Sequence, residues 1–203
     1  MKNQNDPAKG YKELLSSDDG HLIDPQTAEK WRENYRIVQK THHSGNKSVE
    51  GLVFKKEHII KIFSNPDVIG IRIYYGITNE GDKELIIYPV DKLGNDLTAE
   101  PLARNDIGII EKEIAKRWRK NYEYVENNKK SDRVIIKGHF FGKNGILPLV
   151  NLSQCFGIMI YYGLNNHGEK ELLIYAVESN WKHIELEKPI NPLDYSKKCP
   201  PYC

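Results

Sequence analysis

Cysteine is scarce in this sequence, and the three that occur do not form the pattern of a disulfide-rich secreted domain. Cys199 and Cys203 lie within the last five residues, and Cys155 begins an apolar run. Disulfide frameworks use an even number of cysteines at regular spacing. We expect Cys155 to be a buried small hydrophobic residue. Cys199 and Cys203 stay open to three roles: metal ligands, a disulfide under oxidising conditions, or part of a docked or flexible tail.

Long apolar runs and a strong charge excess are also missing. No stretch approaches the roughly 20 apolar residues of a membrane span, and the first residues, MKNQNDPAKGYKELL, lack the apolar core of a signal peptide. We therefore expect a soluble cytoplasmic protein. The net charge is only +2, so nucleic-acid binding, which normally requires a strongly basic patch, has no support.

The common catalytic patterns are absent from the sequence as well. It contains neither an HExxH zinc motif nor a glycine-rich phosphate loop. No nucleophile stands out together with a base and an orienting acid, and no carboxylate pair does. The sequence therefore favours a non-enzymatic role, and it predicts no catalytic residue and no cofactor.

What the sequence does contain is a long internal repeat. The segment GIRIYYG at residues 70–76 recurs as GIMIYYG at residues 157–163. Residue n aligns with residue n + 87 without a gap from Ile23 to Asp91, and 26 of the 69 aligned pairs are identical. Self-similarity on this scale predicts two copies of one unit, most simply related by a pseudo-twofold axis.

The repeat divides the chain into five segments. We expect a polar N-terminal extension at residues 1–22, a first unit at 23–97, a linker at 98–109, a second unit at 110–184 and a tail at 185–203. The tail contains four prolines, which predict an extended or irregular segment.

Each copy begins with an amphipathic helix. Apolar residues recur at helical spacing as Ala28, Trp31, Tyr35 and Val38 in the first copy, and as Ala115, Trp118, Tyr122 and Val125 in the second. Asp24 followed by Pro25 is typical of a helix start. We interpret the two tryptophans as core residues, with a ligand-binding pair as the alternative.

A strand, a short helix and a β-hairpin follow in each copy. VEGLVF and IKGHFF predict the strand, and KKEHIIKIFSN predicts the helix, which Gly145 and Pro148 make less secure in the second copy. The turns ITNEGDK and LNNHGEK contain residues that tolerate positive φ. The predicted fold is α+β: an internal tandem duplication of two α-β-(α)-β-β units, with a mostly antiparallel sheet covered on one face by the tryptophan-bearing helices.

Three motifs resemble a family of small proteins frequent in flavobacteria and their relatives. The family pattern has a VGIRIYxG strand, a V-D-x-x-G-N-D segment after the hairpin and a C-P-P-x-C segment near the C-terminus. The matching residues are Gly70, Arg72, Tyr74 and Gly76, then Val90, Asp91, Gly94, Asn95 and Asp96, and finally Cys199, Pro200, Pro201 and Cys203. The second copy departs from the pattern, with Met159 in place of Arg72. The resemblance implies no activity.

Candidate binding residues are Arg72, Tyr74, Asp96 and Tyr161. The repeated tyrosines serve either as sheet packing or as an aromatic recognition platform, since neighbours along a strand point to opposite faces. Our leading hypothesis is a non-enzymatic binding or assembly protein, present as a monomer or homodimer, whose partner is another protein.

Two alternatives remain. The first is a small enzyme, of the hydrolase or nuclease class, with a site between the copies built from Arg72, His139 and Asp96, which lie near predicted strand ends and differ between the copies. The second is a thiol or metal role for Cys199 and Cys203. A structural zinc site needs four ligands, so two more would have to come from histidines elsewhere.

Overall fold

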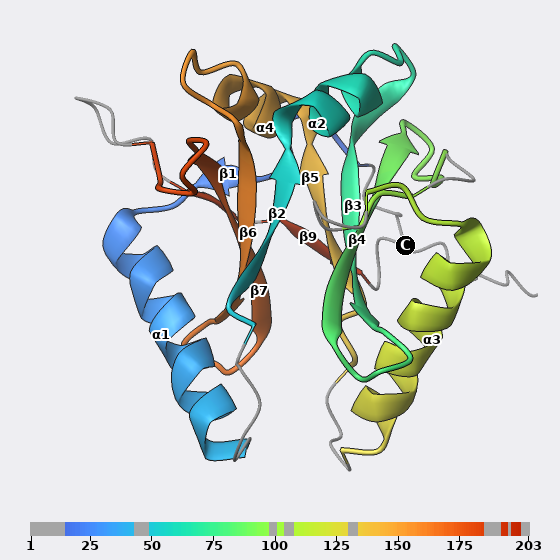
Figure 1. Cartoon of the computed structure of the whole chain (residues 1–203), viewed down its shortest axis with the longest axis vertical. Helices are drawn as coiled ribbons and strands as arrows, with labels where there is room; N and C mark the ends of the chain where they lie inside the picture. Colours follow the sequence, from blue (N-terminus) through green and yellow to red (C-terminus); the bar gives the residue numbers. More distant parts are fainter. Residues whose placement is uncertain are drawn as a thin grey trace, which may run out of the picture.

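The computed structural model of the chain describes residues 15–42, 49–97, 101–103, 108–129, 134–184, 192–194 and 196–199. Within these residues the fold is α+β, with four helices and two antiparallel sheets (Figure 1). The elements are β1 (His21–Leu22), α1 (Pro25–His42), β2 (Gly51–Lys55), α2 (Lys56–Phe63), β3 (Val68–Ile77), β4 (Lys83–Asp91), α3 (Lys112–Asn127), β5 (Gly138–Gly142), α4 (Lys143–Val150), β6 (Gly157–Leu164), β7 (Lys170–Val177), β8 (Leu193–Asp194) and β9 (Lys197–Cys199). The α+β class is confirmed, but there are two sheets where one was expected.

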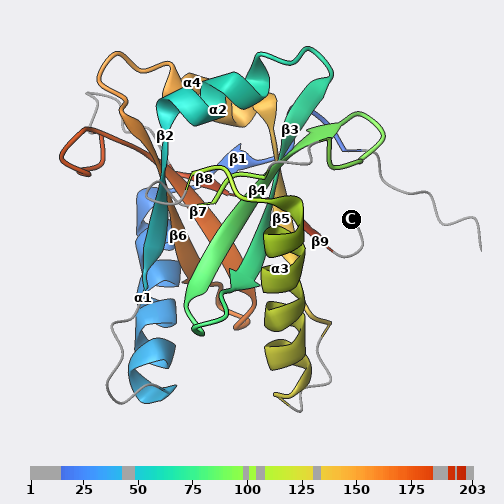
Figure 2. The same ribbon diagram turned by 45° about the vertical axis from the view of Figure 1, so that its right-hand side comes forward.

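The long helices α1 and α3 cover the outer faces of the sheets. α1 packs against β6 and α3 packs against β3, and the two helices lie on opposite sides of the molecule (Figures 1 and 2). Thr27 N–H donates a hydrogen bond to Asp24 Oδ1 at 2.9 Å, so Asp24 caps α1 as predicted. Bonds from Thr27 lower the pKa of this exposed carboxyl group. None of the four helices is long and apolar enough to cross a membrane.

The short helices α2 and α4 pack against each other at one end of the molecule (Figures 1 and 2). α2 buries Ile59 and Phe63. α4 continues through Pro148, although proline cannot donate a helical hydrogen bond. It buries Ile146 and Leu149, and this apolar burial outweighs the poor helix propensity of its sequence.

Each sheet combines strands from the two halves of the chain. The strand orders are β1-β8-β7-β6-β2 and β4-β3-β5-β9. The hairpins β3-β4 and β6-β7 are confirmed as antiparallel. Each hairpin is joined by a strand from the other half of the chain. β2 pairs with β6, and Val53 lies opposite Met159. β5 pairs with β3, and Phe140 lies opposite Arg72.

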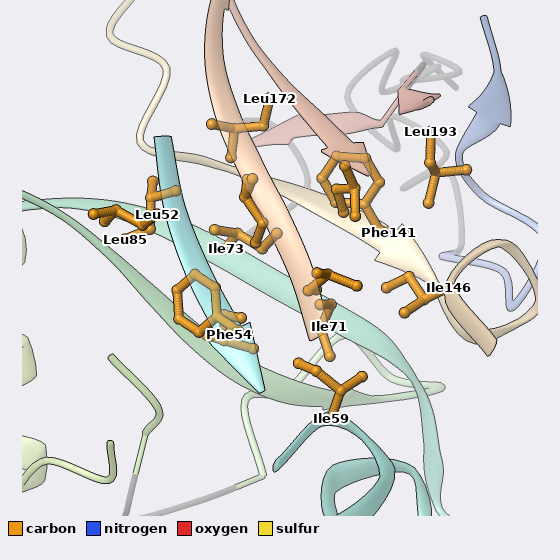
Figure 3. Close-up of a cluster of buried hydrophobic side chains, with 14 of the residues drawn as sticks. Leu52, Phe54, Ile59, Ile71, Ile73, Leu85, Phe141, Ile146, Leu172 and Leu193 are labelled. Atoms are coloured by element: carbon orange, nitrogen blue, oxygen red, sulfur yellow. The ribbon is translucent and has the colours of Figure 1, made fainter. Parts of the chain in front are cut away.

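The main hydrophobic core lies between the two sheets. Side chains alternate along a strand, so Ile71 and Ile73 of β3 point into this core while Arg72 points toward α3. Figure 3 shows Phe54 and Leu52 of β2 in the same cluster. Among the described residues, this core therefore includes side chains from both halves of the chain.

Four tyrosine rings, which we call the tyrosine row, stack in sequence through this core. The centroid distances are 5.4 Å from Tyr35 to Tyr162, 6.1 Å from Tyr162 to Tyr75 and 5.2 Å from Tyr75 to Tyr122. The planes of neighbouring rings differ by at most 27°. Tyr75 and Tyr162 belong to the repeated hairpin tyrosines, and these two pack in the interior, in line with the sheet-packing interpretation.

The described parts of the tail are largely strands, so they are extended, which is one of the two forms expected from its prolines. β8 pairs with β1 and β7, and β9 adds to β5. Cys199 is buried and disulfide-bonded, and in this state its sulfur offers no thiolate to a metal. Cys155 is a buried free thiol, as expected. Cys203 lies outside the described residues.

Candidate functional site

A pocket of about 240 Å³ opens beside α2, between this helix, β4 and the segment that follows β4. Its apolar lining consists of Ile62, Val68, Ile87, Pro89, Leu97, Leu102 and Ile109. Three polar residues, His58, Lys61 and Asn65, complete the lining. Apolar pockets with a few polar groups are the usual form of a binding site, so this pocket is the candidate functional site.

One wall of the pocket comes from the segment expected to be a linker. Leu102 exchanges two backbone hydrogen bonds with Ile87 of β4, at 2.8 and 3.0 Å. Leu97 N–H donates to Pro89 O at 2.9 Å, and Leu102 also forms a bridge with Ile109. These bonds extend the sheet beyond β4 and fix three apolar side chains along the pocket. The sequence of this segment has no periodic pattern that would predict its pairing with β4.

The mouth of the pocket carries exposed apolar surface and basic groups. Leu97 is 39% exposed and Ile109 is 48% exposed. His58 Nδ1 is buried, and it has no hydrogen-bond partner among the described residues. His58 Nε2 lies 4.0 Å from the carboxylate of Glu57. The site therefore suits an apolar group flanked by a polar or acidic one.

The aligned position in the C-terminal half is closed. Gly145 stands where the N-terminal half has His58. A Cβ atom on Gly145 would lie 2.9 Å from Leu193 Cδ1 and 3.5 Å from Gly20 O, so α4 approaches β8 closely. In the N-terminal half, His58 at this position lines the pocket.

Three of the four predicted binding residues meet on the α3 side of β3. Arg72 is 2% exposed, and its Nη1 lies 2.6 Å from Asp96 Oδ1. Tyr74 OH donates to Asp96 Oδ2 at 2.9 Å, and Arg72 Nη2 donates to Gly94 O at 3.2 Å. The guanidinium of Arg119 lies 3.4 Å from the Tyr74 ring centroid. Burial, together with the charge of Asp96, raises the pKa of Tyr74.

This cluster attaches the loop after β4 to the sheet. The bonds from Arg72 and Tyr74 go to Asp96 and its neighbour Gly94, and so they hold the loop after β4 against the sheet. A buried ion pair stabilises a structure only when its members are well bonded, which is the case here. We therefore interpret Arg72 and Asp96 as residues that position the loop.

Tyr161, the fourth predicted binding residue, lies in the other sheet. Its hydroxyl is 2.9 Å from His183 Nε2, and the guanidinium of Arg32 lies 3.7 Å from its ring centroid. His183 also stacks on Tyr175 at 4.2 Å. This cluster repeats the Tyr74 cluster at the aligned positions, with His183 in the place of Asp96 and Met159 in the place of Arg72.

His139 does not join Arg72 and Asp96. It lies opposite Ile73 in the sheet and therefore points into the core, whereas Arg72 points toward α3. Its Nε2 is 3.0 Å from Tyr75 OH and its Nδ1 is 2.6 Å from Ser196 Oγ. Burial, and then the charges of nearby lysines, lower the pKa of His139 to about 3. The three residues of the enzymatic hypothesis are thus divided between two faces of one sheet.

A lysine lies at each end of the tyrosine row, and neither lysine was predicted from the sequence as a site residue. Lys83 Nζ donates to Tyr35 OH at 2.9 Å, and Lys170 Nζ donates to Tyr122 OH at 2.7 Å. Burial lowers the pKa of both lysines to about 8. The signal was present, because the lysines and their tyrosines occupy identical aligned positions.

No protein-family model matches this chain, and neither does any curated protein or solved structure. Among the described residues no group of three or more histidine, cysteine, aspartate or glutamate side chains is placed to hold a metal ion.

Proposed function

We propose that this chain is a binding or assembly protein made of two fused copies of one unit, residues 23–97 and 110–184. In this proposal the pocket beside α2 receives an apolar side chain of a partner protein. The pocket is the observation that carries the proposal, because it is apolar, open and flanked by exposed apolar residues. Side chains that dominate protein interfaces are commonly apolar or aromatic anchors that fill such pockets.

Contacts that recur at a spacing of 87 residues support the proposed duplication. Asn34 Nδ2 donates to Leu164 O at 3.0 Å, and Asn121 Nδ2 donates to Ile77 O at 3.0 Å. The reciprocal exchange of β2 and β5 between the sheets has the same form. A pseudo-twofold axis through the tyrosine row accounts for these pairs of contacts.

The size and charge of the pocket define the partner more closely. Its volume of about 240 Å³ is below the roughly 300–1,000 Å³ typical of small-molecule sites. An aliphatic or aromatic side chain is therefore a better match than a larger free ligand. His58 and Lys61 at the rim favour an acidic residue beside this anchor.

The enzymatic alternative has less support than the binding proposal. A hydrolase or nuclease site between the units would need residues other than the trio of Arg72, His139 and Asp96, because His139 points to the opposite face of the sheet. Cytoplasmic location stays a prediction from the sequence. The disulfide at Cys199 weighs against it, because disulfides are rare in the reducing cytosol.

Selection of peptides from a random displayed library, with the full chain as bait, tests the pocket. We expect selected peptides to share an apolar residue next to an acidic one. Ile109→Glu at the mouth should weaken their binding by about tenfold or more. The matched control is Leu22→Glu, because Leu22 is the exposed residue aligned with Ile109 beside the closed position. Equal binding by both variants, or equal loss in both, would contradict the proposal.

A further inference from the structure

Among the residues that the structure describes, β2 pairs with another strand on one side only. It pairs with β6 along its whole length, and no other strand of the described chain pairs with it. Gly51, Val53 and Lys55 are half-buried, whereas all five residues of β5 are buried. β2 lies at the front of the molecule in Figure 1, with β5 behind it. An edge strand of this kind presents unpaired backbone groups to any extended chain that reaches it.

β5 occupies the corresponding place in the other sheet, but its second side is covered. β9 pairs with it antiparallel, with Gly138 opposite Cys199 and Phe140 opposite Lys197. Lys137 N–H donates to Cys199 O at 2.6 Å. At the aligned positions on β2, which are Gly51 and Val53, the described chain supplies no such strand.

The side chains of β9 show what a strand in this position contacts. Lys198 Nζ reaches across to the other sheet and lies 2.9 Å from Glu169 Oε2 and 2.7 Å from Glu171 Oε1. On the opposite face, Cys199 packs into the small cluster of apolar residues under α3. β9 therefore combines a basic side chain on one face with a small apolar side chain on the other.

Residues aligned with these contact groups occur in the N-terminal half and at α1. Asp82 and Glu84 are aligned with Glu169 and Glu171, and Asp82 is exposed. Trp31, aligned with Trp118 of the cluster under α3, packs on the cluster under α1. Under the proposed duplication, these residues give the edge of β2 the same kind of acidic and apolar surroundings that β9 meets at β5.

We propose that the free edge of β2 binds an extended segment of a partner protein by antiparallel strand addition. The segment carries a lysine or arginine directed toward Asp82 and a small apolar residue opposite Gly51. Main-chain hydrogen bonds supply the affinity in this mode of recognition, and alternate side chains supply the specificity. The inference rests on the proposed duplication, but it uses a surface separate from the pocket beside α2.

A synthetic peptide with the sequence of residues 192–199, in which alanine replaces Cys199, is the probe. Its binding to the full-length chain is followed by fluorescence anisotropy, and its location by hydrogen exchange. We expect slowed exchange at residues 50–55 and saturable binding. A peptide with glutamates in place of Lys197 and Lys198 should bind about tenfold more weakly or worse.

Two variants of the protein separate edge pairing from other binding. Tyr162 N–H donates to Glu50 O, and Lys56 N–H donates to Phe156 O. Alternate residues between them, including Val53, therefore direct their N–H groups to the free edge. Val53→Pro removes that donor and leaves the pairing with β6 in place, whereas the control Val53→Ala keeps it. We expect Val53→Pro to weaken peptide binding by about tenfold.

Asp82→Lys supplies a second, independent test, because the residue is exposed and we expect its replacement to leave the fold intact. It should weaken the binding of the basic peptide and leave the stability unchanged. Ile109→Glu, which blocks the pocket, should leave peptide binding unchanged, so either proposal can fail alone. Binding that neither Val53→Pro nor Asp82→Lys reduces, or protection away from β2, would overturn the inference. Dimer formation through β2 in sedimentation velocity without peptide binding would also overturn it.

Discussion

Arg72 and Asp96 form an ion pair, Nη1 to Oδ1 at 2.6 Å, that ties the loop after β4 to the outer face of β3. The guanidinium is almost completely buried, and the carboxylate also accepts a bond from Tyr74. The aligned residues of the C-terminal half are Met159, which carries no charge, and His183, which stacks on Tyr175. The same loop position is therefore held by charge in one half and by aromatic stacking in the other.

Removing one member of this ion pair should destabilise the protein strongly. We expect Arg72→Met to lower the free energy of unfolding by about 3 kcal/mol, because Asp96 loses a close, buried partner. The double variant Arg72→Met/Asp96→His reproduces the aligned residues of the other half and should be less destabilised than the sum of the single changes. Urea unfolding of the three variants measures these differences, and strict additivity would contradict the expected coupling.

His139 should make the stability depend on pH. Its folded pKa of about 3 lies below the ordinary value of 6.5, so the unfolded chain binds the proton more readily between these values. Stability is thus fully present above about pH 6.5 and falls as the pH decreases toward 3, by at most about 1.4 kcal/mol per pH unit from this group. His139→Gln removes this contribution. Denaturant unfolding at several pH values measures the slope, and an equal slope in both proteins would contradict the assignment.

Gln39 and Glu126 occupy aligned positions next to Lys83 and Lys170. Glu126 lies 2.8 Å from Lys170 Nζ, whereas the aligned residue beside Lys83 is Gln39, whose side-chain amide is neutral. We expect Gln39→Glu to raise the pKa of Lys83 above its present value of about 8, because a carboxylate stabilises the ammonium form. NMR titration of reductively methylated lysines resolves this change.

Stability measurements give an independent check on the lysines. A folded pKa of about 8, below that of the unfolded chain, means that stability rises as the pH increases from about 8 to about 10.5. Gln39→Glu should reduce this rise, and Glu126→Gln should increase it through Lys170. No change in either variant would show that burial alone controls these groups.

Gly70 and Gly157, at the aligned starts of the two repeated strands, should not tolerate a side chain. A Cβ on Gly70 would lie 2.4 Å from Phe141 O, and one on Gly157 would lie 2.5 Å from Phe54 O. Because backbone oxygens cannot move aside, we expect each alanine variant to lose about 3 kcal/mol of stability. Gly81→Ala is the control: its φ is +92° but its Cβ would meet no atom within 4 Å, so a loss of only about 1 kcal/mol is expected.

Local patterns in the sequence predicted the local structure. Asp24 before Pro25 located the start of α1, and glycine in the polar turns located the two hairpins. α4 was less secure because Gly145 and Pro148 disfavour a helix. It forms because tertiary burial overrides propensity, and because the absence of a side chain at Gly145 lets the helix approach Leu193.

Pairing between distant strands could not be predicted from the sequence. The alternation of apolar and polar residues in a strand predicts which side chains are buried, but it does not predict which strand lies beside it. The pairing of β2 with β6 and of β5 with β3 therefore had no local signal. His139 was grouped with Arg72 for the same reason, since only the register with Ile73 reveals that it points to the other face. The pocket depends on Leu102 folding back onto β4, which is also a long-range pairing.

The exchange of β2 and β5 makes the two halves dependent on each other. A fragment that ended after β4 would lack β5, the second strand that pairs with β3, and it would leave β2 without the β6-β7 hairpin that it joins. Such a fragment cannot complete either sheet by itself, so only association with a complementary fragment, or with another copy of itself, would restore the missing pairings. Loss of either half of the chain would thus leave the other half with incomplete sheets, and under the proposed duplication a single unit would complete its sheet only by exchanging strands with a second copy.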